Sequence, residues 1–286
     1  EKMGREENVS IFEDTKKMVK NNKTLAEAVK WSTKNQVLVP EYMEVKEFWE
    51  EWNPDDEFFD KEAEIVVSKK RSYEAAAAYK GKKVCVHNFA SATNPGGGVT
   101  KGSSAQEECL CRCSTLYFNL NVADMWNGFY TPHRNAQDPI HNDDCIYTPE
   151  VVVFKSDTAM PKLLPEEEWY KVDVITCAAP NLRLKPGNAM NVGDGAKAAK
   201  IGDKALLEIH EKRLSRILDI AAAAGDEVVI LGAFGCGAFE NNPEVVARAA
   251  KNVIAKYKKH FETIEFAVYC SPRDERNYEI FKRVLG

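Results

Sequence analysis

The sequence has no long hydrophobic run, no excess of basic residues and no apolar core of a signal peptide near its beginning. Its longest apolar stretches are short, such as 228–234, and do not reach the roughly 18 residues of a membrane helix. We therefore expect a cytoplasmic protein that does not enter a membrane. The formal net charge is −5, whereas proteins that bind duplex DNA usually carry a basic excess, so we expect no direct binding of duplex DNA.

Cysteine pairs of the CxxC type are also missing, although the chain has eight cysteines. Most lie in apolar runs, and we expect reduced and mostly buried thiols. Cys109, Cys111 and Cys113 form a CxCxC pattern on a predicted helix, where residues two apart point to different sides. This pattern favours small core residues over a metal site.

What the sequence does have is the composition of a globular protein: 286 residues, of which 44% are hydrophobic and 29% charged. Beyond residue 60, apolar runs alternate with helical patterns, which predicts an α/β fold with a largely parallel sheet covered on both faces. Strands are predicted at 65–67, 84–89, 151–154, 172–177, 228–234 and 266–270. Helices are predicted at 72–79, 103–117, 203–224, 243–257 and 272–285.

Residues 1–60 are predicted to form a helical extension packed on a main domain of residues 61–286. Ser10 and Glu13 have the spacing of a capping box, which predicts a helix that begins there, and a second helix is predicted over 24–31. An aromatic and acidic stretch is predicted to pack on the main domain as a lid or flank: Phe48, Trp49 and Trp52.

Two long polar segments, 119–144 and 182–202, are predicted to be loops, and loops of such length are usually functional or disordered. Four titratable residues of the first segment suggest a solvated loop in preference to a metal cluster: His133, His141, Asp143 and Asp144. His87 and His210 have no matched partner in the sequence and are predicted to be structural. Cys236, between two glycines, is a candidate reactive thiol but is more simply a buried one.

Two glycine-rich segments follow predicted strands, one over 88–108 and the other over 232–243. Ligands of open α/β sheets bind outside the carboxyl ends of the strands. Consecutive glycines let a ligand approach the backbone, and amides beside a helix N-terminus bind anions. The pair of loops therefore predicts a diphosphate held between them. Neither segment matches a P-loop or a GxGxxG motif.

An acidic pair, Glu107 and Glu108, begins the helix after the first loop. Ser104 and Glu107 have capping-box spacing, so Glu107 alone could simply close the helix, but this leaves Glu108 unexplained. A carboxyl group beside a phosphate-binding loop can act as general acid or base on a sugar bond. The helix N-terminus lowers a carboxyl pKa, whereas a second carboxylate and the phosphates raise it, and the sequence leaves the balance open.

The triplet Gly96–Gly98, followed by seven residues and QEE at 106–108, resembles the signature of poly(ADP-ribose) glycohydrolases, whose catalytic fold is a macrodomain. The strings NFASATNPGGGV, TCAAPN and GAFGCGAFENNP resemble the microbial branch of that family over roughly 60–286. The resemblance implies a macrodomain-like three-layer α/β/α fold with a mostly parallel central sheet. It also implies hydrolysis of ribose–ribose O-glycosidic bonds of poly(ADP-ribose), carried on ADP-ribosylated proteins, to release ADP-ribose without a metal or other cofactor.

Residue by residue, the resemblance implies that Glu108 is the catalytic acid, which protonates the leaving ribose oxygen and then activates water. Glu107 would hydrogen-bond and orient the adjacent ribose, and Phe239 would stack on a ribose. Where the vertebrate type has FAN, this chain has FASATN. The other implied ligand contacts lie in the two loops: Asn88, Ala90, Ser91, Asn94, Gly96, Gly97, Gly98, Val99 and Gln106 in the first, and Gly235, Cys236, Gly237 and Ala238 in the second.

Three alternatives stay open at the level of sequence. The chain could be a module that binds ADP-ribose without cleaving it, in which case Glu108 would not be needed. It could instead hydrolyse mono-ADP-ribosylated protein or nucleic acid. A nucleotide-dependent transferase is a third alternative, and dependence on Mg²⁺ would favour it.

Overall fold

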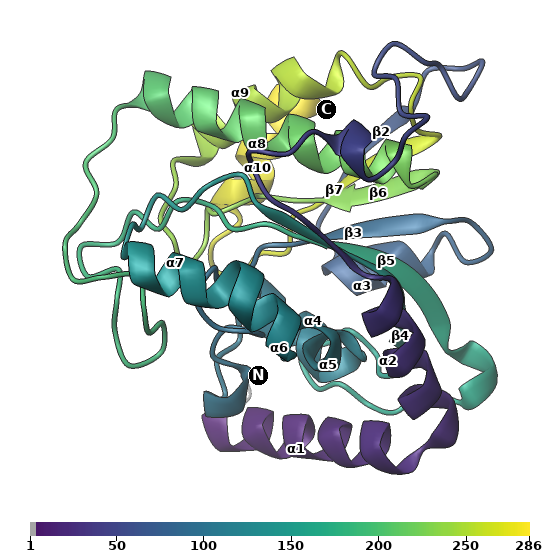
Figure 1. Cartoon of the computed structure of the whole chain (residues 1–286). Helices are drawn as coiled ribbons and strands as arrows, with labels where there is room; N and C mark the ends of the chain where they lie inside the picture. The colour runs from purple at the N-terminus through teal and green to yellow at the C-terminus, as the bar shows by residue number, and fades with distance from the viewer. Residues whose placement is uncertain (1–3) are drawn as a thin grey trace.

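The apolar runs of the chain form a seven-stranded sheet in the computed structural model, which describes residues 4–286 (Figure 1). The strand order is β1-β4-β5-β3-β6-β7-β2. The strands from β5 to β2 run parallel, while β4 is antiparallel to β5 and β1 is antiparallel to β4. The predicted mostly parallel sheet is therefore confirmed. The strands are β1 (Val37–Val39), β2 (Glu64–Ser68), β3 (Val84–Asn88), β4 (Cys145–Val153), β5 (Tyr170–Thr176), β6 (Val228–Leu231) and β7 (Thr263–Ala267).

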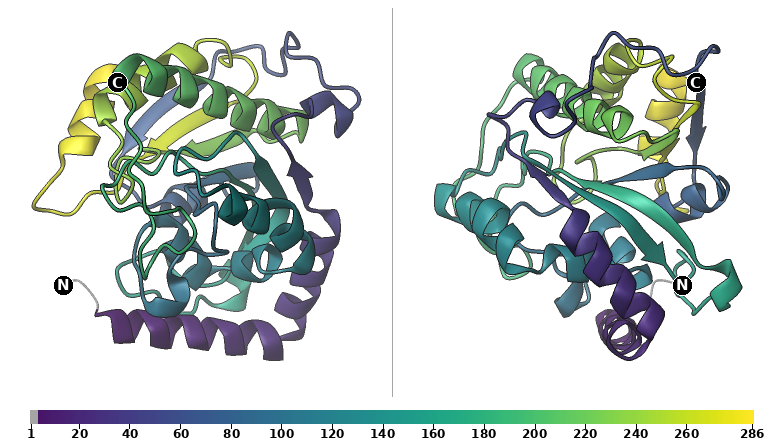
Figure 2. Two further views of the ribbon diagram at one scale, coloured as in Figure 1. Left: turned by 60° about the vertical axis from the view of Figure 1, so that its left-hand side comes forward. Right: turned by 45° about the vertical axis from the view of Figure 1, so that its right-hand side comes forward.

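Helices cover both faces of the sheet, which confirms the three-layer α/β/α architecture (Figures 1 and 2). One face carries α8 (Asp203–Ala223), α9 (Pro243–Ile254) and α10 (Arg276–Leu285). The other carries the remaining helices: α1 (Arg5–Asn21), α2 (Lys23–Asn35), α3 (Ser72–Ala77), α4 (Gln106–Cys113), α5 (Leu116–Leu120), α6 (Ala123–Met125), a π-helix (Trp126–Tyr130) and α7 (Thr131–Ala136). Short 3-10 turns lie at Val45–Glu47, Val99–Lys101 and Glu166–Glu168.

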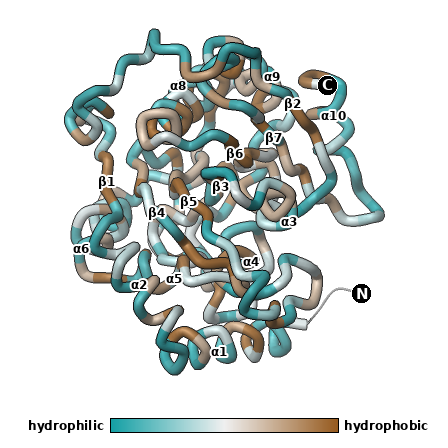
Figure 3. The backbone as a smooth tube through the Cα atoms, turned by 90° about the vertical axis from the view of Figure 1, so that its right-hand side faces the viewer, coloured by the Kyte–Doolittle hydropathy of each residue, from teal (hydrophilic) through white to brown (hydrophobic). Residues whose placement is uncertain are grey.

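The central strands are buried on both faces because each face packs against a layer of helices. Every residue of β3, β6 and β7 is buried. Hydrophobic segments along β1 and β2 stand out in the tube of Figure 3, while many turns at the outside are hydrophilic. The burial of β3, β6 and β7 on both faces explains why these three strands appear in the sequence as continuous apolar runs and not as alternating patterns.

The N-terminal helices pack on the part of the molecule that carries the first glycine-rich loop. Phe12 of α1 is fully buried in the core beneath the sheet. Asn8 Nδ2 donates to the carbonyl of Gly102 over 3.0 Å, and Thr15 Oγ1 donates to the carbonyl of Arg112 over 2.6 Å. The division of the chain at residue 60 stays a prediction. The aromatic stretch of residues 48–52 packs on the core as a flank, as predicted.

Two predicted helices begin at a different residue in the structure, each for a local reason. Helix α1 begins at Arg5 and not at Ser10, because the amide of Gly4 donates to Glu7 Oε2 over 2.7 Å and caps the helix there. Helix α10 begins at Arg276 and not at Pro272, because residues 271–274 form a separate turn.

The predicted helix over 103–117 is two helices. It begins only at Gln106, because Gly102 is left-handed with a φ of 80° and Ala105 is extended. It breaks at Ser114, which is extended and pairs with Val153. The predicted loop over 119–144 is also wrong, since buried apolar residues fold most of it into the short helices from α5 to α7.

Candidate active site

Both glycine-rich loops line a single cavity of about 690 Å³ at the carboxyl ends of the parallel strands. The first loop follows β3 and the second follows the neighbouring strand β6. Gly97 and Gly98 contribute from the first loop, and Gly235 and Phe239 contribute from the second. Cavities of about 300–1,000 Å³ are typical of small-molecule sites. The predicted meeting of the two loops is therefore confirmed.

Gln106 fixes the beginning of α4 against the end of β3. Its side-chain oxygen accepts from the amide of Phe89 over 2.8 Å, and its nitrogen donates to the carbonyl of His87 over 2.7 Å. The same nitrogen donates to Ser72 Oγ over 3.0 Å. These bonds join a strand, a loop and two helices at one side chain. The two glutamates that follow are therefore held at defined positions beside the loop.

The Glu107 carboxylate is buried, with 3% of the residue exposed, and faces the end of β3. Asn88 Nδ2 donates to one oxygen over 2.8 Å, and the amide of Ser91 donates to the other over 2.9 Å. Glu107 does not bond to Ser104, so the capping-box interpretation is wrong; Ala105 is the residue that precedes the helix. Burial, with the nearby charge of Glu108, raises the Glu107 pKa from 4.5 to about 8 despite these two donors.

The Glu108 carboxylate lines the cavity and is 7% exposed. Its Oε1 accepts from the amide of Gly98 over 3.0 Å. Burial raises the pKa of this carboxyl, while the Gly98 amide and the charge of Arg112 lower it less strongly. Desolvation, which was not among the effects weighed from the sequence, thus has the largest influence on this pKa. A carboxyl with a raised pKa is suited to proton donation near neutral pH.

Gly97 lies so close to both carboxylates that a larger residue would have to displace them. Its φ is +59°, and a Cβ at this position would lie 2.8 Å from Glu108 Oε1 and 3.2 Å from Glu107 Oε1. The glycine triplet therefore lets the backbone approach the carboxylates, in addition to any contact with a ligand.

The second loop presents backbone amides to the cavity. Within residues 4–286, the amides of Gly237, Ala238 and Phe239 donate to no protein acceptor. Asn241, which is 2% exposed, holds the loop: its Nδ2 donates to the carbonyl of Pro180 over 2.7 Å, and its Oδ1 accepts from His210. These amides can bind the oxygens of a diphosphate. No pattern in the sequence indicates that Asn241 holds this loop.

The first loop offers fewer free amides than expected from its three glycines. The amide of Gly97 donates to Asn94, that of Gly98 to Glu108, and that of Val99 to Gly96. Of the candidate contacts, Ser91, Gly97, Gly98, Gln106, Gly235, Gly237, Ala238 and Phe239 line the cavity together with both glutamates. Asn88, Ala90, Asn94, Gly96, Val99 and Cys236 are not among its lining residues.

The segment 182–202 has no helix or strand, as predicted, and it covers the first loop. Asn94 Nδ2 donates to the carbonyl of Val192 over 2.8 Å, and Ser91 Oγ donates to Asn191 Oδ1 over 3.3 Å. This segment brings Met190 and Asn191 to the wall of the cavity. No local pattern in the sequence indicates which loop it would cover, and these two residues were not anticipated.

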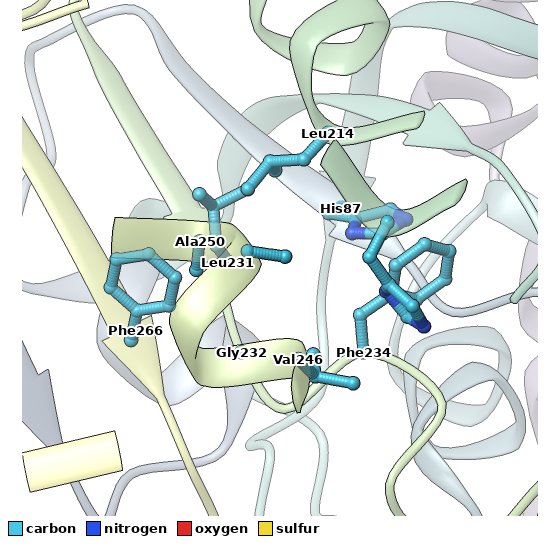
Figure 4. A pocket seen from close by; sticks show the side chains of 10 residues that line it. His87, Leu214, Leu231, Gly232, Phe234, Val246, Ala250 and Phe266 are labelled. Carbon is cyan, nitrogen blue, oxygen red and sulfur yellow. The ribbon is translucent and has the colours of Figure 1, made fainter. Parts of the chain in front are cut away.

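His87 and His210 face a separate cavity of about 20 Å³ between the sheet and the helices above it (Figure 4). Its size fits about one water molecule. His87 Nε2 donates to the carbonyl of Cys177 over 3.2 Å, and its ring packs on Phe234. Burial lowers the pKa of His87 to about 3 and that of His210 to about 4. Both histidines are therefore neutral packing residues, as predicted.

The four titratable residues at 133–144 form neither a solvated loop nor a metal cluster; all four are buried. His141 Nε2 donates to Asp194 over 2.8 Å, and Asp143 pairs with Arg213 over 3.1 Å. In the described chain, no three His, Cys, Asp or Glu residues are placed to hold a metal ion. Cys111 and Cys113 belong to the core, as predicted, whereas Cys109 reaches the cavity. Burial raises the pKa of Cys236, which disfavours a reactive thiolate.

The fold of this chain is similar to that of known proteins. Residues 4–156, which include the first loop and both glutamates, match the family described as "Microbial-type PARG, catalytic domain". The chain belongs to this family of poly(ADP-ribose) glycohydrolases. The glycohydrolase of Thermomonospora curvata is similar in structure, with a TM-score of 0.81 and 26% identity over 97% of this chain and 98% of that one. No curated protein sequence matches this chain.

Two further glycohydrolase structures are similar and contain ligands. The Thermomonospora curvata enzyme bound to the inhibitor ADP-HPD has a TM-score of 0.78 and 27% identity, over 96% of this chain and 98% of that one. The Deinococcus radiodurans enzyme in complex with ADP-ribose has a TM-score of 0.73 and 28% identity, over 90% of this chain and 96% of that one. Within residues 4–286 of this glycohydrolase, no helix is both long and apolar enough to cross a membrane.

The raised pKa of Glu107 predicts a pH-dependent loss of stability. The folded state holds a proton that the unfolded chain releases near pH 4.5, so this group stabilises the fold fully below that pH and its contribution is lost as the pH rises through about 8. Compared with the wild type, Glu107→Gln should become relatively more stable between pH 5 and pH 9. Urea unfolding at both pH values measures this difference. If the difference in unfolding free energy between the variant and the wild type were the same at both pH values, the raised pKa of Glu107 would be contradicted.

Proposed function

We propose that Glu108 protonates the leaving oxygen of a ribose–ribose bond while the two loops hold the diphosphate of the same ADP-ribose unit. Family membership makes this chain a glycoside hydrolase that acts on poly(ADP-ribose) and releases ADP-ribose. The observation that carries the residue assignment is the position of the Glu108 carboxyl, which lies in the cavity that both loops share. Burial raises the pKa of this carboxyl above its usual value, which favours its role as a proton donor.

After the bond breaks, the deprotonated Glu108 accepts a proton from the attacking water. The transition state resembles an oxocarbenium ion, and the carboxylate and a diphosphate nearby both stabilise its positive charge. Glu107 is held by Asn88 and Ser91 beside Glu108, which suits it to orient the ribose by a hydrogen bond. We assign the diphosphate chiefly to the amides of Gly237, Ala238 and Phe239, since those of Gly97, Gly98 and Val99 in the first loop already have partners.

Turnover of poly(ADP-ribose) is the direct test of this function. The protein is incubated with the polymer, and free ADP-ribose is followed over time without added metal. Steady release supports the proposal. Binding of ADP-ribose without any release would instead make the chain a binding module. A parallel assay with mono-ADP-ribosylated protein tests the alternative substrate.

The proposal also covers the setting of the reaction. ADP-ribosylated proteins would carry the polymer, and the enzyme would act in the cytoplasm without binding duplex DNA directly. All eight cysteines are free thiols, which fits a reducing compartment. The net charge of −5 gives no general attraction to duplex DNA.

Phe239→Ala is expected to weaken the affinity for ADP-ribose about tenfold while lowering the stability of the fold only slightly. The Phe239 ring is half-buried at the cavity wall and packs on the edge of the core, so most of its exposed area is free for a ribose. Calorimetric titration with ADP-ribose and urea unfolding measure the two effects. Equal free-energy losses in binding and unfolding would make Phe239 a core residue instead.

A further inference from the structure

The cavity extends beyond the two loops, along the side of α4 that faces the segment after β4. We call this extension the α4 arm; it is lined by Arg71, Cys109, Arg112, Asp157 and Thr158. The segment runs beside α4 because the amides of Phe154 and Lys155 both donate to the carbonyl of Cys113. No arm side chain has a direct role in the mechanism proposed above, although Arg112 influences the pKa of Glu108 and the arm is continuous with the cavity that contains Glu108.

Two guanidinium groups meet in the α4 arm at the thiol of Cys109. Arg71 Nη1 and Arg112 Nη2 each lie 3.5 Å from Cys109 Sγ. Arg112 is only 2% exposed, and its other partner is the carbonyl of Ser103 at 2.6 Å. Neither arginine has a carboxylate within ion-pair distance in the part of the chain that the structure describes. A buried cation without a paired anion, as at Arg112, is costly, and a bound anion removes that cost. Arg71 is half-buried, and its guanidinium lies 4.0 Å from the centre of the Tyr269 ring.

Asp157 adds a second, independent sign of a ligand in the arm. The residue is 7% exposed, and its Oδ2 accepts from the amide of Tyr73 over 2.9 Å. Its Oδ1 is buried without a hydrogen-bond partner among the described residues. Burial raises its pKa to about 6, so it is mainly ionised at neutral pH and accepts hydrogen bonds. An occupant of the arm should therefore bring a hydroxyl or amino donor as well as an anion.

We propose that the α4 arm binds a second ADP-ribose unit of the polymer, the neighbour of the unit that is released. This inference rests on the proposed function. A polymer unit supplies both features that the arm requires: a diphosphate for Arg71 and Arg112, and ribose hydroxyls for Asp157. Inorganic pyrophosphate would supply only the first. The continuity of the arm with the reaction cavity allows a covalently linked neighbour to occupy it.

The test separates the polymer from its monomer. Binding is measured by calorimetry in a Glu108→Gln background, with ADP-ribose and with an oligomer of defined length as ligands. Arg71→Gln and Asp157→Asn should each weaken the affinity for the oligomer about tenfold, the loss expected for one charge-assisted contact, and leave the affinity for ADP-ribose within about twofold. Arg248→Gln, an exposed arginine of α9 away from the cavity, controls for the lost charge and should change neither affinity.

Each other outcome overturns the inference. Equal losses for ADP-ribose and for the oligomer would place Arg71 and Asp157 at the first unit. Unchanged affinities for both ligands would mean that the polymer does not enter the arm. Thermal unfolding of each variant checks the fold, and the nearly isosteric Asp157→Asn preserves an acceptor for the amide of Tyr73 if Arg71→Gln is unstable. Absence of turnover by the wild-type protein would contradict the proposed function separately, since these binding measurements do not depend on catalysis.

Discussion

Glu108→Gln is expected to slow the release of ADP-ribose from the polymer by a factor of about 10² to 10⁴, the usual contribution of a general acid–base group. The amide has the shape of the carboxyl and retains an oxygen that can accept from Gly98, so the loop should keep its position. It cannot donate a proton to the leaving oxygen or accept one from water. Affinity for ADP-ribose should therefore change little while turnover is lost.

The measurement combines a time course of free ADP-ribose with calorimetric titration of the product. Glu208→Gln, an exposed glutamate of α8, is a matched control that removes one carboxylate far from the cavity and should leave both values unchanged. Normal turnover in the Glu108 variant would remove this residue from the mechanism. A loss of ADP-ribose binding together with a lower unfolding temperature would show that Glu108 mainly holds the first loop in place.

The reaction centre could be predicted from the sequence because its parts are close along the chain. A strand, a glycine-rich turn and a helix follow one another within 84–113, and the bonds of Gln106 connect the end of the strand to the start of the helix. The close contact of Gly97 with Glu108 also arises within this unit. Local order along the chain therefore specifies which groups meet.

The walls of the cavity could not be predicted in the same way, because they depend on contacts between distant segments. Asn191 reaches Ser91 only after the segment 182–202 has folded over the first loop. Asn241 holds the second loop through the carbonyl of Pro180, a residue far away along the chain. The raised pKa of Glu107 likewise depends on complete burial, which no local pattern reveals.

Helix boundaries show the same limit at a smaller scale. Ser10 and Glu13 have the correct spacing for a cap, but the helix begins earlier, where the amide of Gly4 donates to the Glu7 side chain. Ser10 therefore lies in the interior of the helix. Ser104 and Glu107 also have capping spacing, yet the Glu107 carboxylate binds the end of β3 instead. A spacing rule identifies possible partners, and tertiary contacts decide which bond forms.

Gly97→Ala is expected to reduce turnover about 10²-fold even though it leaves every catalytic side chain in the sequence. A Cβ at this position would lie 2.8 Å from Glu108 Oε1, which is closer than the two atoms can approach, so the carboxyl or the loop must move. Displacement of a catalytic group by about 1 Å can cost this much activity. The time course of ADP-ribose release measures the effect, and urea unfolding measures the accompanying loss of stability.

The positive φ of Gly97 complicates the interpretation, because alanine is strained there by about 1–2 kcal/mol whatever it touches. Gly225→Ala supplies the matched control: its φ is +86°, and an added Cβ would meet nothing within 4 Å. Both variants should lose stability through the positive φ, and Gly97→Ala should lose more because of its close contact with Glu108, but only Gly97→Ala should lose turnover at a temperature where both are folded. Equal activity in both variants would show that the Glu108 carboxyl tolerates displacement. Its close contact with the glycine backbone would then not be a requirement of catalysis.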